Sequence, residues 1–363
     1  MTKKIKILIA TGGTGGHVFP AYSLASYFVE KNYNVELITD NRGYDFLKYY
    51  KDLKLTKINS SPLIKKNIYT LFLSIFIIKF AVLKSLFYLI RKRPKIIFGM
   101  GGYSSFPICI AASILRIQFI IYENNLIIGK ANRYLLPFAK KIFVSYKNLE
   151  GISKKYNKKI CEIGNLIRKE IIDFKSEKNN NQDIIKILVL GGSQAARIFA
   201  EKLPFIFKKC IENKIQIKIY QQCLKNQNDK LNLFYKDLNI DFKIFNFSSD
   251  ITDYFSKVDL AITRSGASIL SELTNSNIPF ISVPLPTSAD NHQLKNGLYY
   301  KKLFYGYLIE EKNLDSELFE LINILYQDKS LLEKIKMNQS QHSDKNVFQN
   351  VSLQLEKIFD EKN

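Results

Sequence analysis

The sequence contains few residues of the types that form metal centres and disulfide frameworks. Its 363 residues include four cysteines, far apart and without a C-x-x-C pair, and three histidines with no i, i+4 pairing. These patterns indicate neither a structural zinc site nor a disulfide-rich secreted domain. No D-x-D sequence occupies a loop after an apolar, strand-like run. We therefore expect a protein of the reducing cytoplasm that binds no metal ion and no cofactor.

Acidic residues are outnumbered, with 33 Asp and Glu against 54 Lys and Arg, which gives a formal net charge of +21. Such an excess fits a nucleic-acid surface, an anionic membrane surface or a general enrichment in lysine and asparagine. Lysines occur in nearly every segment, so general enrichment accounts for most of the excess. Because no DNA- or RNA-binding motif is present, we expect no nucleic-acid partner.

The N-terminus lacks the long apolar run of a signal peptide. In "MTKKIKILIATGG" basic residues precede apolar ones, but Lys6 interrupts the run and glycines end it after four apolar positions. That length is too short for the apolar core of a signal peptide. The segment predicts a buried parallel strand instead.

Apolar runs of strand length alternate with helical patterns over the whole chain. This alternation predicts an α/β protein of GT-B type, with parallel sheets covered by helices in two doubly wound, Rossmann-like domains. Residues 5–17 and 185–197 each read as strand, Gly-Gly turn and helix, so each can open one domain. The runs are "KILIA", "NVELIT", "KIIFGM", "FIIYEN", "KIFVSY", "KILVLGG", "QIKIY", "FKIFNF", "LAIT" and "PFISVP".

The most hydrophobic segment covers residues 62–93 and is flanked by basic residues. From Ile68 to Ile90 it is long enough to span a bilayer, but Lys79 and Lys84 interrupt it. We expect a helical region at a membrane surface, with its apolar side inserted and its cations at anionic headgroups. A buried helix whose lysines reach the surface and a spanning helix are the alternatives.

Three turns of small residues follow predicted strands and precede predicted helices. The first, "ATGGTGGHVFP", fails the dinucleotide pattern G-x-G-x-x-G because Val18 occupies the third glycine position. Such turns let backbone N–H groups and a helix N-terminus meet an anion such as a diphosphate. "GGSQAAR" and "TRSGASILSE" suit the same purpose.

Polar side chains near the C-terminal turns fit a hydroxyl-rich ligand. Glu272, in the second turn of its predicted helix, would bind sugar hydroxyls, or else serve as a capping acid. Asp290, Asn291, His292 and Gln293 cluster at the start of another helix, where Asp and Asn are also ordinary caps.

These motifs together resemble the MurG family in order and spacing over nearly the whole chain. MurG enzymes are peripheral membrane transferases that move N-acetylglucosamine from UDP-N-acetylglucosamine onto undecaprenyl-diphospho-N-acetylmuramoyl-pentapeptide (lipid I), completing lipid II. The reaction inverts the anomeric centre and needs no metal. The motifs are "GGTGGHVFPA", "GMGGYSSFP", "YENN" followed by "GKAN", "GNLIR", "GGSQAAR", "TRSGASILSEL" and "PLPTSADNHQLKN".

The resemblance implies a domain organisation and a location. Residues 1–163 would bind acceptor and membrane, residues 164–340 would bind UDP-N-acetylglucosamine, and a C-terminal helix at about 341–363 would pack back on the first domain. The protein would act at the cytoplasmic face of the membrane. Its partners would be lipid I, an anionic lipid surface, and cell-wall synthesis and division proteins.

The resemblance also assigns roles to single residues. His17 would take the proton of the attacking hydroxyl, or else cap its loop and bind diphosphate; Glu123 is the alternative base or the group that orients His17. Independently of the resemblance, the lack of a metal site suggests that helix dipoles and cations such as Arg168 and Arg264 would stabilise a leaving diphosphate. Acceptor contacts are expected at Thr14, Gly15, Gly16, Gly102 and Tyr103, and donor contacts at Asn125, Arg168, Ser193, Gln194, Ala267, Ser268, Glu272 and Gln293.

Several positions depart from the family pattern. Tyr122 and Asn124 replace the His and Gln of H-E-Q-N, and Ala195 replaces a glycine. Leu166 and Ile167 occupy the positions of Pro and Val in the family motif G-N-P-V-R. Cys223 and Leu224 lie in a turn that usually reads Q-[ST]-G, so they alter the loop expected beside the uracil.

Three other functions share parts of the pattern. A diacylglycerol glycosyltransferase would share the donor half but not the combination of "GGTGGH" and "GMGGYSS". A UDP-N-acetylglucosamine epimerase would not need the apolar segment at residues 62–93. A non-catalytic sugar-nucleotide binder would not need His17.

Overall fold

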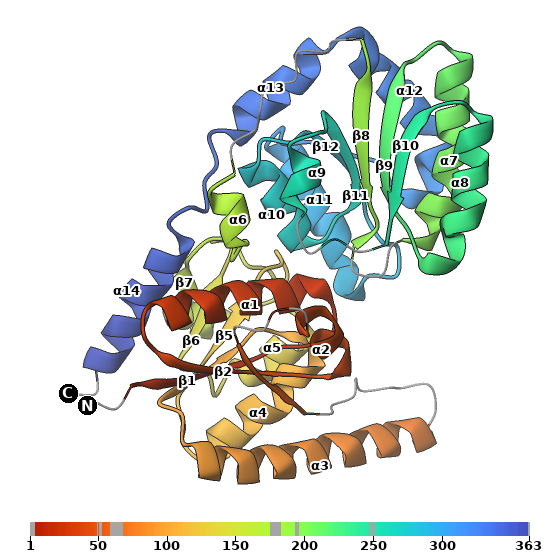
Figure 1. Cartoon of the computed structure of the whole chain (residues 1–363). Helices are drawn as coiled ribbons and strands as arrows, with labels where there is room; N and C mark the ends of the chain where they lie inside the picture. Colours follow the sequence, from red (N-terminus) through yellow and green to blue (C-terminus); the bar gives the residue numbers. More distant parts are fainter. Residues whose placement is uncertain are drawn as a thin grey trace. The chain divides into compact units, whose positions relative to one another are not determined.

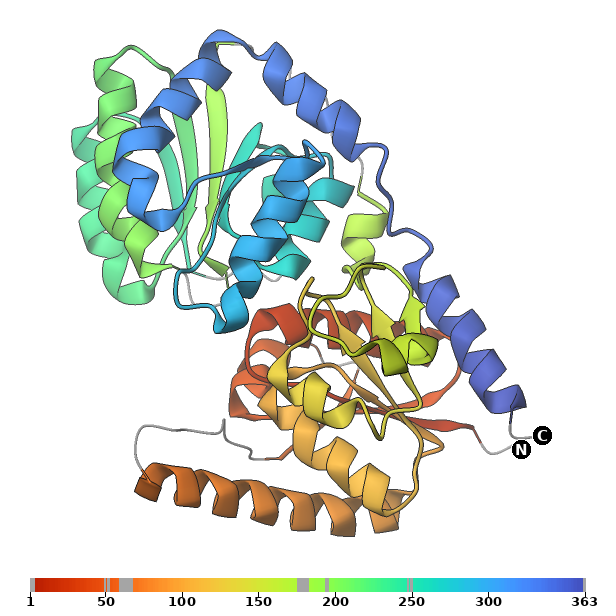
Figure 2. The same ribbon diagram turned by 180° about the vertical axis from the view of Figure 1, so that it is seen from behind.

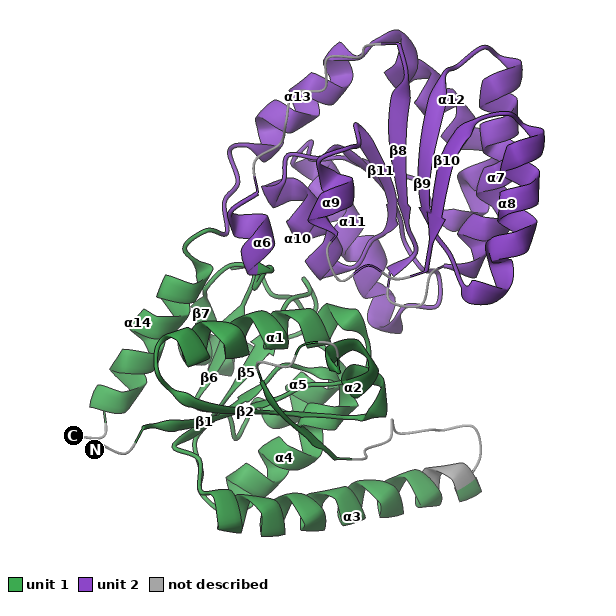
Figure 3. Ribbon diagram, in the orientation of Figure 1, with its two compact units in different colours: residues 1–168, 345–363 green, residues 169–344 purple. Residues whose placement is uncertain are grey.

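The computed structural model divides the chain into two compact units, which Figure 3 shows in different colours. Unit 1 contains Met1–Arg168 and Lys345–Asn363, and unit 2 contains Lys169–Asp344. Residues 164–168, expected in the second domain, therefore belong to unit 1, and residues 341–344 belong to unit 2. The structure describes residues 4–48, 50, 53–58, 68–174, 183–192, 196–246, 248 and 251–361.

Unit 1 is built on a seven-stranded parallel sheet in the order β3-β2-β1-β4-β5-β6-β7 (Figure 1). Most residues of its inner strands are Ile, Leu, Val and Phe, as expected where both faces of a sheet are covered, although β2 also contains Glu36. The strands are β1 (Lys6–Ala10), β2 (Asn34–Thr39), β3 (Lys54–Lys57), β4 (Ile96–Gly99), β5 (Phe119–Glu123), β6 (Lys141–Val144) and β7 (Ile160–Glu162).

Helices cover both faces of this sheet (Figures 1 and 2). One face carries α3, α4 and α5, and the other carries α1, α2 and α14. Their bounds are α1 (Gly15–Glu30), α2 (Asn41–Leu47), α3 (Ile68–Lys92), α4 (Gly102–Ile114), α5 (Lys130–Leu135) and α14 (Val347–Asp360).

Unit 2 repeats the architecture with a six-stranded parallel sheet in the order β10-β9-β8-β11-β12-β13. Its strands are β8 (Ile185–Leu190), β9 (Ile217–Gln222), β10 (Asp241–Phe245), β11 (Leu260–Arg264), β12 (Phe280–Val283) and β13 (Tyr307–Leu308). Its helices are α6 (Lys169–Ile172), α7 (Arg197–Glu212), α8 (Asn228–Asp237), α9 (Thr252–Phe255), α10 (Ala267–Asn275), α11 (His292–Lys302), α12 (Leu314–Gln327) and α13 (Ser330–Gln339).

The first strand of each unit lies inside its sheet, and the chain continues outward on both sides of it. β2 and β4 flank β1, and β9 and β11 flank β8. This order confirms the predicted doubly wound α/β fold. It also creates a switch point between β1 and β4 and another between β8 and β11, and ligands of such sheets bind outside the carboxyl ends of the strands there. In unit 1 the glycine-rich turns after β1 and β4 lie at this point.

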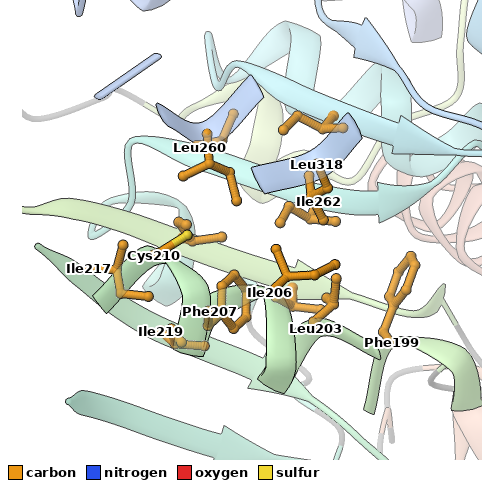
Figure 4. Packing of buried hydrophobic residues seen from close by; sticks show 14 of the residues in the cluster. Phe199, Leu203, Ile206, Phe207, Cys210, Ile217, Ile219, Leu260, Ile262 and Leu318 are labelled. Atoms are coloured by element: carbon orange, nitrogen blue, oxygen red, sulfur yellow. The ribbon is translucent and has the colours of Figure 1, made fainter. Parts of the chain in front are cut away.

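The core of unit 2 forms where α7 packs on the sheet (Figure 4). Phe199, Leu203, Ile206, Phe207 and Cys210 recur at helical spacing along α7, and each is at most 5% exposed. They pack with apolar side chains of β9, β11 and α12. Burial of each large side chain stabilises the unit by about 1.5–3 kcal/mol, an upper range because denatured chains also bury surface.

The C-terminal helix α14 packs on α1 within unit 1. The rings of Phe348 and Tyr27 stack with centroids 5.0 Å apart, and the Tyr27 and Ser352 hydroxyls are hydrogen-bonded at 2.9 Å. The amide of Asn350 donates to the carbonyl of Ile163 at the end of β7. These contacts join α14 to α1 and to the segment that follows β7.

Helix α3 presents a row of large apolar side chains to the outside. Phe72, Phe76 and Phe87 are 65%, 68% and 71% exposed, whereas Ser74 and Ser85 are 3% and 0% exposed. Ala81 and Leu89 are also buried, at 2% and 0% exposed, so α3 carries apolar residues on its inner face and, unlike a usual surface helix, on its outer face as well. In the described part of the chain, α3 is the helix whose length and composition would let it cross a membrane, with a mean hydropathy of 2.0 over its apolar window. That window is only 22% buried, so the buried-helix alternative is wrong.

A buried carboxylate on β2 holds the C-terminal end of α3. Glu36 is 2% exposed and accepts hydrogen bonds from Thr56 on β3, at 2.7 Å, and from Lys92 of α3, at 3.1 Å. Burial raises the pKa of Glu36, but the Tyr88 hydroxyl, Thr56 and Lys92 outweigh it and hold that pKa below its usual value. Lys6 of β1 donates to the last carbonyl of the helix, that of Lys92. The end of α3 is thus fixed to the sheet edge by charge as well as by packing.

Replacing this carboxylate should cost stability in a pH-dependent way. At pH 7 we expect Glu36→Gln to lower the free energy of unfolding by about 1–3 kcal/mol, because buried hydrogen bonds to a charged group are lost. Since the pKa of Glu36 is depressed in the folded state, its stabilising effect is complete above the unfolded-state pKa of about 4.3 and is lost as pH falls through the folded-state pKa. Urea unfolding at pH 7 and in the acid range should therefore show the two proteins converging at low pH.

The surface variant Glu201→Gln, which removes one exposed partner of Arg197, serves as the control. Its effect should be about 0.5 kcal/mol or less at every pH. A Glu36→Gln deficit that is independent of pH would contradict the ionic account of this contact.

Candidate functional site

The first glycine-rich turn connects β1 to α1. Thr14 is the exposed N-cap residue of α1, and Gly15, Gly16 and His17 are the first three residues of the helix. Gly13 has a φ of +83°, a conformation that favours glycine. The backbone N–H groups of this first helical turn lie at the positive end of the helix dipole, a favourable place for an anion.

The second glycine-rich turn lies against His17. A Cβ atom at Gly101 would stand 2.9 Å from Cε1 and 3.0 Å from Nδ1 of the imidazole, and one at Gly102 would stand 3.6 Å from its Cδ2. Both glycines also have positive φ, +85° and +75°. The half-buried ring of His17 therefore packs on backbone that only glycine leaves open. Tyr103, the next residue, is 53% exposed.

The carboxylate of Glu123 is buried at the end of β5 and is saturated with hydrogen bonds. Oε1 accepts from the backbone N–H and the side-chain amide of Asn125, at 3.1 and 2.9 Å. Oε2 accepts from the backbone N–H of Gly129, at 2.8 Å, and from Asn132, at 3.0 Å. Glu123 is 2% exposed, so water does not compete for these bonds. The carboxylate thus shapes the loop that carries Asn125.

Two positions that depart from the family pattern have structural partners. Asn124 donates to the carbonyl of Gly16 at 3.0 Å and so links β5 to the first turn of α1. The hydroxyl of Tyr122 bonds to Ser145 at 2.9 Å and accepts from the N–H of Leu166 at 3.0 Å. Tyr122 therefore supports β6 and the segment after β7, and it is 3% exposed.

Arg168 lies at the end of unit 1. Its guanidinium stands over the ring of Phe19 in α1, 5.2 Å from the centroid. Arg168 therefore contacts α1 and belongs to unit 1, whereas the sequence analysis placed it in the second domain. Such a contact holds a planar cation at a fixed place while leaving its edge for hydrogen bonds.

The candidate donor residues of unit 2 lie around the carboxyl ends of β11 and β12. Ala267 and Ser268 begin α10, and Glu272 is buried one turn further along. Gln293 begins α11 and accepts from the N–H of Leu285 at 2.9 Å, which closes the loop after β12. Two other predicted donor contacts, Ser193 and Gln194, lie outside the described residues.

Arg264 has a structural partner that the sequence did not reveal. Its guanidinium forms an ion pair with Glu311 at 2.5 Å and donates to the carbonyls of Val283 and Pro284 at 3.3 Å. The residue is 8% exposed. Arg264 thus supports the end of β12, and Glu311 balances its charge. Its role as a cation for the leaving diphosphate stays a prediction.

The altered turn after β9 is held by a polar cluster. The buried thiol of Cys223 donates to Asn228 at 3.1 Å, and Asn246 donates to the carbonyl of Cys223 at 3.0 Å. Burial raises the pKa of the Cys223 thiol, which keeps it protonated and a donor at neutral pH. This turn therefore has a defined structure without the glycine usual at this position.

Sequence reasoning missed Asp40 and Ser104. Asp40 caps α2 and also accepts from the N–H of Gly13 and the hydroxyl of Ser104. The available signal was an acidic residue directly after the strand "NVELIT", at the carboxyl edge of the sheet where the glycine-rich turns also lie.

Family models match both units. The Glycosyltransferase family 28 N-terminal domain matches residues 7–144, and the Glycosyltransferase family 28 C-terminal domain matches residues 186–351.

Curated relatives match over the full length. The UDP-N-acetylglucosamine--N-acetylmuramyl-(pentapeptide) pyrophosphoryl-undecaprenol N-acetylglucosamine transferase of Pelagibacter ubique (strain HTCC1062) is 35% identical over 358 residues, 98% of this chain and 99% of that protein. The protein of the same name in Rickettsia canadensis (strain McKiel) is 34% identical over 337 residues, 92% of this chain and 94% of that protein.

Solved structures share the fold. Acinetobacter baumannii MurG superimposes with a TM-score of 0.76 at 23% identity, covering 98% of this chain and 100% of that one. S. aureus MnaA, solved with UDP, gives 0.69 at 14% identity over 98% of this chain and 97% of that one. With both domain models and two full-length relatives above 30% identity, the chain belongs to glycosyltransferase family 28 and, within it, to the MurG family.

Proposed function

We propose that this chain transfers N-acetylglucosamine from UDP-N-acetylglucosamine to the C4 hydroxyl of the muramoyl residue of lipid I and so forms lipid II. The names of the full-length relatives state this donor and this acceptor. The observation that carries the proposal is the imidazole of His17 packed between two glycine-rich turns at the switch point of unit 1. That arrangement offers a proton acceptor beside amides suited to an anion.

His17 is the proton acceptor in this account. Inversion at the anomeric carbon requires the C4 hydroxyl to attack opposite the leaving UDP, and a base must take the hydroxyl proton as the new bond forms. An imidazole titrates near neutral pH and suits that role. Its ring is held by the backbone of Gly101 and by the first turn of α1, which supports a fixed orientation.

Glu123 is a positioning residue in this account and not the base. Both of its oxygens already accept two hydrogen bonds each, so a proton transferred to either would break contacts with Asn125, Gly129 or Asn132. The network instead holds Asn125, which we propose as a donor contact.

Substrate contacts follow from the same geometry. Thr14, Gly15 and Gly16 at the start of α1, with Gly102 and Tyr103 at the start of α4, would receive the acceptor. The N-terminus of α10 at Ala267 and Ser268 would receive the donor diphosphate, whose charge the helix dipole would help to balance without a metal ion. Arg168 stays a predicted donor contact. Glu272 and Gln293 would bind sugar hydroxyls; Ser193 and Gln194 remain predicted donor contacts.

The exposed face of α3 is the proposed membrane contact. Its phenylalanines lie among lysines and arginines, and the helix packs on α4 along unit 1, which supports a helix lying in the interface at the cytoplasmic face and not one spanning the bilayer. Cell-wall synthesis and division proteins stay predicted partners.

The activity is tested by UDP release from UDP-N-acetylglucosamine in the presence of a lipid I analogue. We expect release that depends on lipid I and that UDP-glucose does not support. Release with a diacylglycerol acceptor in place of lipid I would favour the lipid glycosyltransferase instead. Conversion of UDP-N-acetylglucosamine without any acceptor would favour an epimerase.

The membrane contact is tested by replacing Phe72, Phe76 and Phe80 together with Ser. Loss of three inserted rings should lower binding to anionic liposomes by about tenfold or more. Turnover of lipid-embedded acceptor should fall, whereas turnover of a detergent-soluble analogue should remain at the wild-type level. The matched control replaces Phe205, Leu233 and Phe304, which are equally exposed on unit 2. Equal liposome binding by both triple variants would contradict the assignment.

A further inference from the structure

Asp40 makes more hydrogen bonds than a helix cap requires. It follows β2 directly, and its Oδ1 accepts from the N–H of Gly43 at 2.8 Å, which is the usual capping bond of α2. Both carboxylate oxygens also accept from the N–H of Gly13, at 3.2 and 3.0 Å. Oδ2 accepts in addition from the hydroxyl of Ser104, at 2.8 Å. Three of the four bonds therefore leave the helix that Asp40 caps.

These extra bonds reach the two glycine-rich turns that hold His17. Gly13 lies in the turn after β1, and Ser104 lies in the first turn of α4, directly after Gly101 and Gly102. Asp40 is therefore a single anion that joins both turns from a third strand. Hydrogen bonds to an ionised carboxylate are about twice as strong as those between neutral groups.

The two turns also touch each other closely beside Asp40. A Cβ atom at Gly12 would stand 2.3 Å from the Oγ of Ser104 and 2.9 Å from the Cγ of Asp40. A Cβ atom at Gly102 would stand 3.0 Å from the carbonyl oxygen of Gly12. The backbone of the first turn is thus confined between Asp40 and the start of α4, and small displacements there would move the surface on which the imidazole of His17 rests.

We infer that Asp40 is a positioning residue, which joins the two glycine-rich turns and thereby fixes the place of the His17 imidazole. The inference rests on the proposed function for its effect on turnover. It also refines the expected acceptor contacts. Because the N–H of Gly13 donates to Asp40, the acceptor diphosphate would bind the amides of the first turn of α1 and not this one.

Four variants separate positioning from capping. Asp40→Ser keeps a good N-cap for α2, because serine caps about as well as aspartate, but its short side chain does not bridge Gly13 and Ser104. Asp40→Ala removes both functions. Asp40→Asn keeps an acceptor for Gly13 and Gly43 and a donor for the Ser104 hydroxyl. Asp45→Ser removes an exposed acid of the same helix that pairs with Lys48, and it is the matched control.

Turnover with a lipid I analogue gives the first readout. We expect Asp40→Ser and Asp40→Ala to lower kcat by about 10- to 100-fold with the donor KM unchanged, because misplacement of a catalytic group by about 1 Å costs that much. Asp40→Asn should retain most of the wild-type kcat, and Asp45→Ser all of it. A wild-type kcat in Asp40→Ser would overturn the inference and leave Asp40 as a cap alone.

The imidazole resonances give a second readout that does not depend on activity. The chain has three histidines, His17, His292 and His342, and the last two belong to unit 2. In protein with labelled histidine, Asp40→Ser should shift or broaden the ring signals of His17 and leave the other two in place. An unmoved His17 signal would overturn the inference even if the proposed function holds. A wild-type protein without lipid I-dependent turnover would contradict the function and leave this readout intact.

Discussion

The place of the His17 imidazole depends on the absence of a side chain at Gly101. A Cβ atom there would stand 2.9 Å from Cε1 of the ring, and the backbone has a φ that other residues rarely adopt. The strand order brings His17 and Gly101 together, because β1 and β4 are neighbours and the turns that follow them lie at the same edge of the sheet. Asn124 and Asp40 then join the same turns from β5 and β2. The position of His17 therefore depends on residues that follow or end four adjacent strands, β2, β1, β4 and β5.

The architecture was predictable from sequence because its inner strands are rich in apolar residues and alternate with helical patterns along the chain. The strands that were missed are β3, β7 and β13, which lie at or near sheet edges and are short. The sequence of β3 is "KLTK". Because two of its four residues are exposed lysines, its sequence does not indicate a strand that pairs with β2. Such strands are specified by a neighbour and by long-range packing, which local periodicity does not report.

The site was predictable only in part. His17 and the glycine-rich turns stand out in the sequence, because such turns between a strand and a helix suit an anion. The roles of charged residues could not, because they depend on partners distant in sequence. Arg264 is balanced by Glu311, Glu123 is saturated by the loop that follows it, and Asp40 joins two turns. Each of these side chains is of a type that can act in catalysis. Its hydrogen-bond and ion-pair partners decide whether it does so or supports the structure.

The central claim is that His17 takes the proton and that Glu123 only positions. The pH dependence of kcat/KM tests it most directly, measured for wild type, Glu123→Gln and His17→Gln. The account predicts that Glu123→Gln keeps the acidic limb of the wild-type profile with lower turnover, and that His17→Gln loses that limb together with a loss of about 100-fold or more in kcat. Loss of the limb in Glu123→Gln, with near-normal turnover in His17→Gln, would contradict it.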